Sequence, residues 1–193
     1  IVMDGAYQPS HPGALAHLDP PPLTASIAAD LICAGLNNNL LAEELSPGLS
    51  SLERQLCRWF AQRLGLPEIA GGVLATGGTL SNLMALVTAR SQQGPGDGVV
   101  LCSRDAHVSL QKATRVMGLA SDALMQLPVD AAGRLCSTSL EQTLQDLHRR
   151  GRPCLAVVAT AGTTIRGAID PLAEIASVCR RHEVWLHVDA AIG

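Results

Sequence analysis

The sequence predicts an α/β fold in which a mainly parallel sheet is covered by helices on both faces. From residue 71 onward, short apolar segments alternate with longer segments in which apolar residues recur at helical spacing. Short apolar strands separated by helices are typical of parallel sheets whose two faces are both buried. Polar residues and glycines follow several of these strands directly, at the edge where open parallel sheets bind their ligands.

An N-terminal arm and two helices are expected ahead of the first strand. Five of the eleven prolines lie within residues 8–22, and this density excludes a regular helix or a central strand. Apolar residues at helical spacing predict helices over residues 23–37 and 51–65, the second with Ser51 as its N-cap. Two helices ahead of any strand suggest a layer for dimerisation or docking.

Residues 1–70 therefore form one expected segment, and residues 71–193 form a second one in which strands and helices alternate. Thr138 or Ser139 is expected to cap one helix, and Asp170 another, with Pro171 at its first position. Strands are expected over residues 71–76, 98–103, 123–129, 153–164 and 184–191, and helices over 80–94, the later part of 104–118, 137–151 and 170–183.

The composition indicates a well-buried globular protein and excludes some classes of partner. The chain has 193 residues, of which 47% are hydrophobic and 16% are charged, and its formal net charge is −3. This balance argues against disorder. Because no basic face or acidic tail stands out, neither a nucleic acid nor a membrane is expected as a partner.

The cysteines and the ends of the chain suggest a cytoplasmic protein of which this is a part. Six cysteines lie far apart without metal-ligand spacing, which predicts buried, reduced thiols and no metal site. Neither a signal peptide nor a bilayer-spanning apolar run is present. The chain begins without Met and ends directly after a strand, so we expect it to belong to a longer polypeptide.

Four groups of residues with chemical potential follow predicted strands. They are Gly77–Thr79, the Asp105–His107 loop, Thr163–Thr164 and Asp189. The stretch "TGGTLSN" offers glycines and a hydroxyl at the start of a helix, where free amides favour an anion such as phosphate. It could also be a tight turn with Thr79 as helix N-cap. It matches neither of the glycine fingerprints of nucleotide-binding proteins, so a Rossmann-like nucleotide binder is disfavoured.

Asp189 raises the question of what neutralises a carboxylate at the end of a buried strand. An ionised acid in this position is costly without a positive partner, and Lys112 is the only lysine in the chain. A protonated pyridine nitrogen would meet this requirement, whereas the alternatives are a turn cap or an arginine pair. His187 shares a face of the strand with Asp189, and by itself a core role is the more common one for such a histidine.

The other polar groups also allow two interpretations when each is taken alone. His107 opens a helix after a strand and could present its flat ring to a planar cofactor, or it could be a surface or capping residue. Thr163 and Thr164 could contact a ligand or could act only as turn hydroxyls.

Taken together, four motifs in this order and spacing resemble the group II pyridoxal-phosphate-dependent amino acid decarboxylases. They are "TGGTLSNLMAL", "DAHVSLQKA", "ATAGTTIRGAIDP" and "WLHVDAA". Upstream, "HPGALAHLDPPPLTASIAADLI" and "SPGLSSLERQLCRWF" look like the substrate-side arm and helices of this family. The resemblance covers nearly the whole chain. It implies the large domain of fold type I, with a mainly parallel seven-stranded sheet that is incomplete in this chain.

The resemblance implies pyridoxal 5'-phosphate as the cofactor and assigns roles to matching residues. Gly78 and Thr79 would hold the phosphate, while His107 would stack on the pyridine ring and assist proton transfer. Asp189 would form a salt bridge with the ring nitrogen, so that the ring can accept the electrons released when carbon dioxide departs. His107 and Asp189 are therefore the catalytic candidates.

Further positions follow from the same resemblance. Thr164 would lie beside the ring, and Ala191 would pack against the face opposite His107. His17 and Pro20, the first residue of a run of three prolines, would line the substrate entrance. Members of this family usually build their sites across a dimer interface, so a homodimer is implied.

The chain departs from the family at the lysine that forms a Schiff base with the cofactor. In the family this lysine follows the Asp motif, beyond the point where the present chain ends. Lys112 matches nothing in that lysine motif, and an exposed helical lysine is the expected interpretation. Two explanations stay open, namely a longer protein or a truncated paralogue that acts as an interaction subunit without activity.

The resemblance implies decarboxylation of an L-amino acid to the corresponding amine and carbon dioxide. The arm resembles the diaminobutyrate enzymes somewhat more than the glutamate enzymes, which is a weak basis for choosing a substrate. A second possibility is another fold type I lyase or an aminotransferase, because the cofactor supplies the same electron sink to all of them.

Overall fold

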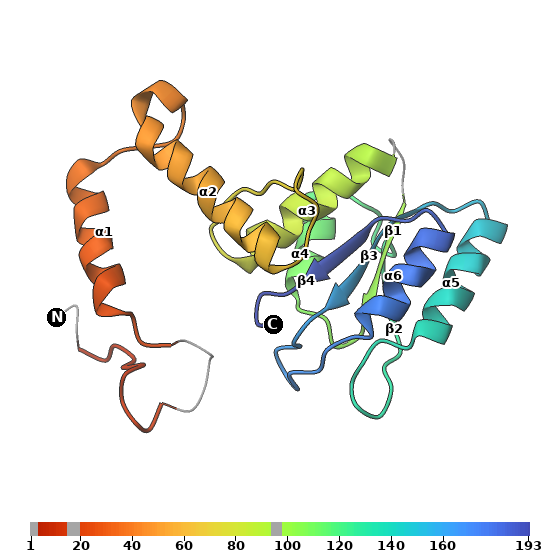
Figure 1. Cartoon of the computed structure of the whole chain (residues 1–193). Coiled ribbons are helices and arrows are strands. Elements are labelled where there is room, and N and C mark those ends of the chain that lie inside the picture. Colours follow the sequence, from red (N-terminus) through yellow and green to blue (C-terminus); the bar gives the residue numbers. More distant parts are fainter. Residues whose placement is uncertain (1–3, 15–19, 94–97) are drawn as a thin grey trace. The chain divides into compact units, whose positions relative to one another are not determined.

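The computed structural model describes residues 4–14, 20–93 and 98–193. The chain divides into two compact units, Ile1–Leu74 and Ala75–Gly193 (Figure 1). The first unit is helical, and the second contains the sheet. His17, one of the expected substrate-side residues, lies outside the described residues.

In the first unit, the described residues form two α-helices and a short 3-10 helix. Helix α1 spans Thr24–Leu36 and ends at Asn37, whose φ of 48° places it in the left-handed region. After the 3-10 helix η1 at Glu43–Leu45, helix α2 spans Pro47–Arg63. The expectation that Ser51 caps α2 is wrong, because the helix begins one turn earlier. Pro47 occupies its first turn, where the fixed φ of proline suits a helix and its missing N–H costs no bond.

The second unit is built around four parallel strands. They are β1 at Val99–Ser103, β2 at Leu124–Leu127, β3 at Cys154–Thr160 and β4 at Leu186–Asp189, in the spatial order β2-β1-β3-β4. Ser103 lies opposite Leu127, and Thr160 lies opposite Asp189. Because the register aligns the last residues of neighbouring strands, their carboxyl ends meet at one edge of the sheet.

Helices cover both faces of this sheet, as the apolar strands predict. The helices are α3 at Gly78–Gln93, α4 at Ser109–Val116, α5 at Ser137–Arg149 and α6 at Leu172–Arg181. In Figure 1, α3 and α4 lie on one face and α5 and α6 on the other. Successive residues of β1 alternate between the two cores: Leu101 packs in the core of α5 and α6, and Val100 in the core of α3 and α4. Burial of both faces explains why the strands lack polar alternation.

The strand expected over residues 71–76 does not form. These residues have no regular secondary structure, and the backbone N–H of Leu74 donates to Oε1 of Glu53 at 3.1 Å. A strand needs a neighbouring strand to bond its backbone groups, and the described residues supply none to this segment. Apolar content alone therefore gave a wrong prediction here.

The expected helix caps are also wrong, for a reason that involves tertiary contacts. Helix α5 has Cys136 at its N-cap and no side-chain capping bond, so neither Thr138 nor Ser139 caps it. Helix α6 begins at Leu172, with Pro171 at the N-cap. The buried carboxylate of Asp170 instead accepts backbone N–H groups from Leu135 at 2.6 Å and Thr160 at 2.7 Å. Asp170 thus ties the end of β3 to the segment before α5.

All six cysteines are free thiols, but their burial varies more than the sequence suggests. Cys102 and Cys179 are buried, whereas Cys33 is exposed. Burial raises the pKa of Cys102 and of Cys154 to about 12, so these thiols stay protonated at neutral pH. Among the described residues, no helix combines the length and the apolar character needed to cross a membrane.

Candidate functional site

The residues singled out in the second unit lie at the carboxyl edge of the sheet. Gly78 is the first residue of α3, and His107 lies in the loop between β1 and α4. Thr164 follows β3, and Asp189 is the last residue of β4. In a parallel sheet the loops after the strands gather at one edge, and this arrangement accounts for the grouping.

A buried asparagine connects two of these positions. The side chain of Asn82, on α3, is 3% exposed and lies between β4 and the start of α4. Its Nδ2 atom is 2.9 Å from Oδ2 of Asp189 and 2.9 Å from Oγ of Ser109. Its Oδ1 atom is 2.7 Å from Nε2 of His187. Asn82 therefore has hydrogen-bond partners on both ends of its carboxamide.

Ser109 extends this network to His107. The Oγ atom of Ser109 is 2.9 Å from Nδ1 of His107, and the Ser109 backbone N–H donates to the same nitrogen at 3.2 Å. Ser109 is fully buried at the start of α4, whereas His107 is exposed at the edge of the sheet. A continuous chain of hydrogen bonds thus joins the exposed His107 ring to the Asp189 carboxylate.

Asp189 is a buried carboxylate without a cationic side chain beside it. It is 8% exposed, and its Oδ1 accepts the backbone N–H of Ala191 at 3.2 Å while Oδ2 accepts Asn82. Within the described part of the chain, no lysine or arginine forms an ion pair with it. Neither an arginine pair nor a cap alone therefore explains Asp189. A carboxylate with free acceptor capacity fits a protonated ring nitrogen.

His187 does not supply the missing positive charge. Burial lowers the pKa of His187, and the Asp189 charge opposes this effect only in part. The imidazole is therefore neutral at physiological pH, and the half-buried ring is held through Nε2 by its bond to Asn82. The common structural role anticipated for such a histidine is the one observed.

The start of α3 has the features of an anion cradle. Gly77 has a φ of 87°, which favours glycine, and α3 begins at the next residue. A Cβ on Gly78 would lie 3.4 Å from Cβ of Ala191, so the two segments are close together. Thr79 is exposed and lies inside the first turn, which excludes it as the N-cap. The first amides of a helix lack intrahelical acceptors and attract a phosphate.

The loop after β3 is held by its own contacts and by one ion pair. Thr163 is buried, and its Oγ1 accepts the backbone N–H of Ala168 at 3.1 Å, so it is a turn hydroxyl. Thr164 is exposed. Arg166 lies 3.5 Å from Oδ2 of Asp105, which links this loop to the one that carries His107. Thr164 is therefore the threonine of the pair that a ligand could reach.

Two further residues named from the sequence are exposed. Pro20 is exposed in the first unit, ahead of α1. Lys112 is exposed on α4, as expected of a surface lysine. Sequence reasoning missed Asn82 and Ser109. A signal for Asn82 was present, since it shares a helix face with the buried Leu86 and Ala89 and is the polar exception on that face.

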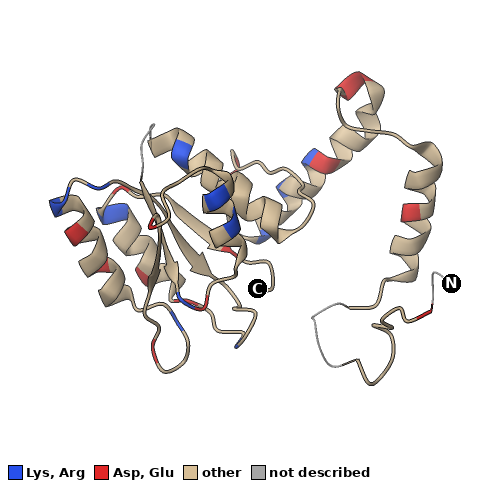
Figure 2. Ribbon diagram, turned by 180° about the vertical axis from the view of Figure 1, so that it is seen from behind, with Lys and Arg blue, Asp and Glu red and all other residues tan. Residues whose placement is uncertain are grey.

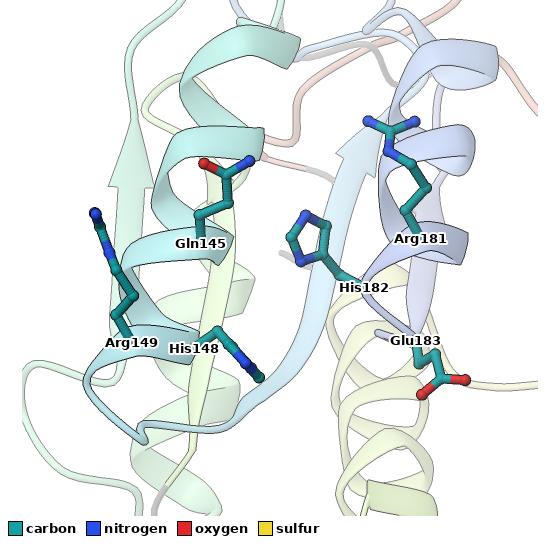
Figure 3. A pocket seen from close by; sticks show the side chains of 6 residues that line it. All are labelled: Gln145, His148, Arg149, Arg181, His182 and Glu183. Carbon is teal, nitrogen blue, oxygen red and sulfur yellow. The ribbon is translucent and has the colours of Figure 1, made fainter.

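A pocket elsewhere in the second unit is lined by none of the site residues predicted from the sequence. It has a volume of about 550 Å³ and lies between the C-terminal ends of α5 and α6 (Figure 3), at the edge of the sheet opposite Asp189. His182 and Arg181 both pair with Glu141 and lower its pKa to about 2. Positive side chains are favoured at helix C-termini. As Figure 2 illustrates, α5 and α6 carry charges of both signs.

Comparisons with known proteins show which family the chain resembles. The chain matches the family profile described as the pyridoxal-dependent decarboxylase conserved domain over residues 1–193. It is 40% identical, over 195 aligned positions, to an L-2,4-diaminobutyrate decarboxylase of Rhizobium meliloti strain 1021, covering 100% of this chain and 39% of that protein. An aromatic-L-amino-acid decarboxylase of Bacillus atrophaeus is 31% identical, over 95% of this chain and 39% of that protein.

A solved structure extends the similarity to three dimensions. The glutamate decarboxylase domain of diaminobutyrate-pyruvate transaminase and L-2,4-diaminobutyrate decarboxylase from Vibrio parahaemolyticus superimposes with a TM-score of 0.90 at 32% identity. The match covers 96% of this chain and 44% of that one. The chain thus spans less than half the length of the proteins it matches.

Proposed function

Because the chain belongs to the pyridoxal-dependent decarboxylase family, we propose that it forms the N-terminal part of the cofactor-binding domain of an L-amino-acid decarboxylase. The reaction is the conversion of an L-amino acid to the corresponding amine and carbon dioxide. The observation that carries this proposal is the buried Asp189 carboxylate, which has no cationic partner among the residues that the structure describes and is linked by hydrogen bonds to His107.

The residues at the sheet edge fit the cofactor of this family, pyridoxal 5'-phosphate. Gly78 and Thr79 at the start of α3 would hold its phosphate. Asp189 would hold a proton at the pyridine nitrogen, since a buried carboxylate is most stable beside a positive charge. When bound, this cofactor supplies an electron sink for the pair released as carbon dioxide departs.

The remaining residues would orient the ring and the substrate. His107 would cover one face of the ring and Ala191 the other, with Thr164 beside it. The Nδ1 atom of His107 is held by Ser109, whereas its Nε2 atom has no partner in the described part of the chain. Nε2 is therefore the nitrogen that can exchange a proton with substrate. His17 and Pro20 would line the substrate entrance.

The substrate class is an L-amino acid, with L-2,4-diaminobutyrate as the first compound to test. Two relatives named as L-2,4-diaminobutyrate decarboxylases are 40% and 34% identical to this chain. A relative named as a cysteine sulfinic acid decarboxylase is 33% identical over 87% of it. The spread of these substrates is a reason to test acidic, aromatic and basic amino acids together.

A homodimer in the cytoplasm completes the proposal. Helix α1 has no buried residue, and Ile27, Leu31 and Leu36 expose more than half of their surface. An apolar helix of this kind is stabilised when a second subunit covers it. The six free thiols suit a reducing compartment. Residues 1–70 would then serve the substrate side and the dimer contact, and residues 71–193 would bind the cofactor.

The direct test is carbon dioxide release by the protein expressed from its full coding sequence. The purified protein, supplied with pyridoxal phosphate, is assayed with diaminobutyrate, glutamate, cysteine sulfinate and aromatic amino acids, and the amine is identified by mass spectrometry. We expect one of these classes to be turned over. Asp189→Asn should reduce kcat/KM about 100-fold or more, since loss of a charged contact in such a site costs roughly 3 kcal/mol.

Asp122→Asn is the matched control, because that carboxylate is exposed and, among the described residues, forms an ion pair with Arg152 alone. It should retain the activity of the parent protein. Absence of amine and carbon dioxide with every class, from a folded protein that has bound its cofactor, would contradict the proposed reaction.

A further inference from the structure

Asn82 makes none of the proposed cofactor contacts, yet it is the centre of the hydrogen-bond network. It is 3% exposed, and its carboxamide reaches Asp189, Ser109 and His187. The direction of each hydrogen bond can be deduced from the chemistry of these partners. Asp189 fixes the first of these directions, because an ionised carboxylate can only accept hydrogen bonds.

The atom of Asn82 that faces Asp189 must therefore be the amide nitrogen. Nδ2 lies 2.9 Å from Oδ2 of Asp189, which fixes the orientation of the whole carboxamide. Oδ1 then faces Nε2 of His187 at 2.7 Å and must accept a hydrogen bond from it. Since burial keeps His187 neutral, its single proton lies on Nε2.

The second N–H of the same amide group fixes the direction of the next bond. Nδ2 of Asn82 donates to Oγ of Ser109 at 2.9 Å, so the Ser109 hydroxyl accepts there and has its own proton free. That proton can go to Nδ1 of His107, 2.9 Å away. The backbone N–H of Ser109 approaches the same nitrogen at a longer distance of 3.2 Å, so it favours a lone pair there more weakly than the hydroxyl does.

We propose that Asn82 is a positioning residue that couples the Asp189 carboxylate to the His107 ring and holds neutral His107 in the tautomer with its proton on Nε2. Every donor in the network is then matched by an acceptor, from Asp189 through Asn82 and Ser109 to His107. The proton of His107 then lies on Nε2, for which the described residues provide no partner. The assignment of the tautomer depends on the hydrogen bonds alone. Only the exchange of the Nε2 proton with a substrate rests on the proposed function.

The tautomers can be measured without cofactor or substrate. The full-length apo-protein is labelled with [15N]histidine, and His107 and His187 are identified by comparison with His107→Gln and His187→Gln. Long-range proton–nitrogen spectra at a pH where the rings are neutral then report which nitrogen carries the proton. We expect Nε2 for both histidines. A proton on Nδ1 of His107 in the parent protein would overturn the proposal.

Two variants test the coupling itself. Asn82→Leu keeps the approximate volume and removes the amide, so the Ser109 hydroxyl becomes free to turn and His107 should become a mixture of tautomers. Ser81→Ala, an exposed neighbour on α3, should leave the spectrum unchanged. A tautomer population in Asn82→Leu equal to that of the parent would contradict the proposal.

Ser109→Ala removes the hydroxyl that links Asn82 to His107. This variant provides the test if Asn82→Leu does not fold. His107 should then become a mixture of tautomers, while His187 keeps its proton on Nε2 because its bond to Asn82 remains. An unchanged His107 would overturn the proposal. The measurement is independent of turnover, so an inactive protein with these tautomers would refute decarboxylation and leave the role of Asn82 standing.

Discussion

Asn82 and Asp189 are 107 positions apart in the sequence, and their side chains are joined by a hydrogen bond of 2.9 Å between Nδ2 and Oδ2. The bond connects α3, whose start is the proposed phosphate site, to β4, whose last residue is the proposed partner of the ring nitrogen. The two halves of the proposed cofactor site are therefore held at a fixed separation by a buried contact within the protein.

Thr79→Ala should weaken cofactor binding through the phosphate. The exposed hydroxyl of Thr79 in the first turn of α3 is placed to bond an anion, and a hydrogen bond to a charged group contributes about 1.5–3 kcal/mol. The Kd for pyridoxal phosphate should therefore rise about tenfold or more, measured by fluorescence titration of the full-length protein. Thr88→Ala, on the same helix with its hydroxyl bonded to Met84, is the control. Equal affinities in both variants would argue against a phosphate at Thr79.

Asp170→Asn should destabilise the second unit. Both carboxylate oxygens of Asp170 accept buried backbone N–H groups, and an amide would turn a donor toward one of them. We expect the free energy of unfolding to fall by about 2–4 kcal/mol, measured by urea titration. Asp146→Asn, an exposed carboxylate paired with Arg149 and Arg150, should change it by less than about 0.5 kcal/mol. Similar midpoints for the two variants would refute the tying role of Asp170.

Gly98→Ala should destabilise the protein because the added Cβ would clash with neighbouring atoms, and not because of the backbone conformation at Gly98. A Cβ on Gly98 would lie 2.5 Å from Cγ of Leu155 and 3.0 Å from the carbonyl oxygen of Pro153. Overpacking of this kind costs about 1–3 kcal/mol. Gly35→Ala, inside α1 with nothing within 4 Å, should instead stabilise its helix by about 0.5–1 kcal/mol. Calorimetry of both variants should give shifts of opposite sign, and a stabilised Gly98→Ala would contradict the packing.

Glu141 should make a contribution to stability that depends on pH. Its hydrogen bonds to His182 and Arg181 lower its pKa from 4.5 to about 2 in the folded state. A lowered folded pKa means that the contribution is present above pH 4.5 and is lost as pH falls toward 2. The difference in free energy of unfolding between the parent and Glu141→Gln should therefore shrink between pH 6 and pH 3. A difference that grows on acidification would have the wrong sign.

The features predicted well from the sequence are those governed by local pattern. The strands from β1 to β4 and the helices from α3 to α6 lie within the predicted ranges or within two residues of them, since burial on both faces imposes apolar runs. The position of Asp189 at the sheet edge also follows, because the carboxyl ends of parallel strands meet there.

The features that were missed depend on partners distant in sequence. The segment at 71–76 is apolar, but a strand forms only beside another strand. The sequence Asp170-Pro171 predicts a helix cap, yet the Asp170 carboxylate accepts the backbone N–H groups of Leu135 and Thr160. Asn82 is recognisable in the sequence as a polar residue on a buried helix face, but its partners lie up to 107 positions away and no local pattern indicates them.

Cofactor binding by Asp189→Ala tests the central claim most directly. The full-length protein, Asp189→Ala and Lys112→Ala are titrated with pyridoxal phosphate, and bound cofactor is then reduced with borohydride and mapped by mass spectrometry. We expect at least tenfold weaker binding for Asp189→Ala, parent-like binding for Lys112→Ala, and a reduced adduct on a lysine other than Lys112. Undiminished binding by Asp189→Ala, or an adduct on Lys112, would contradict it.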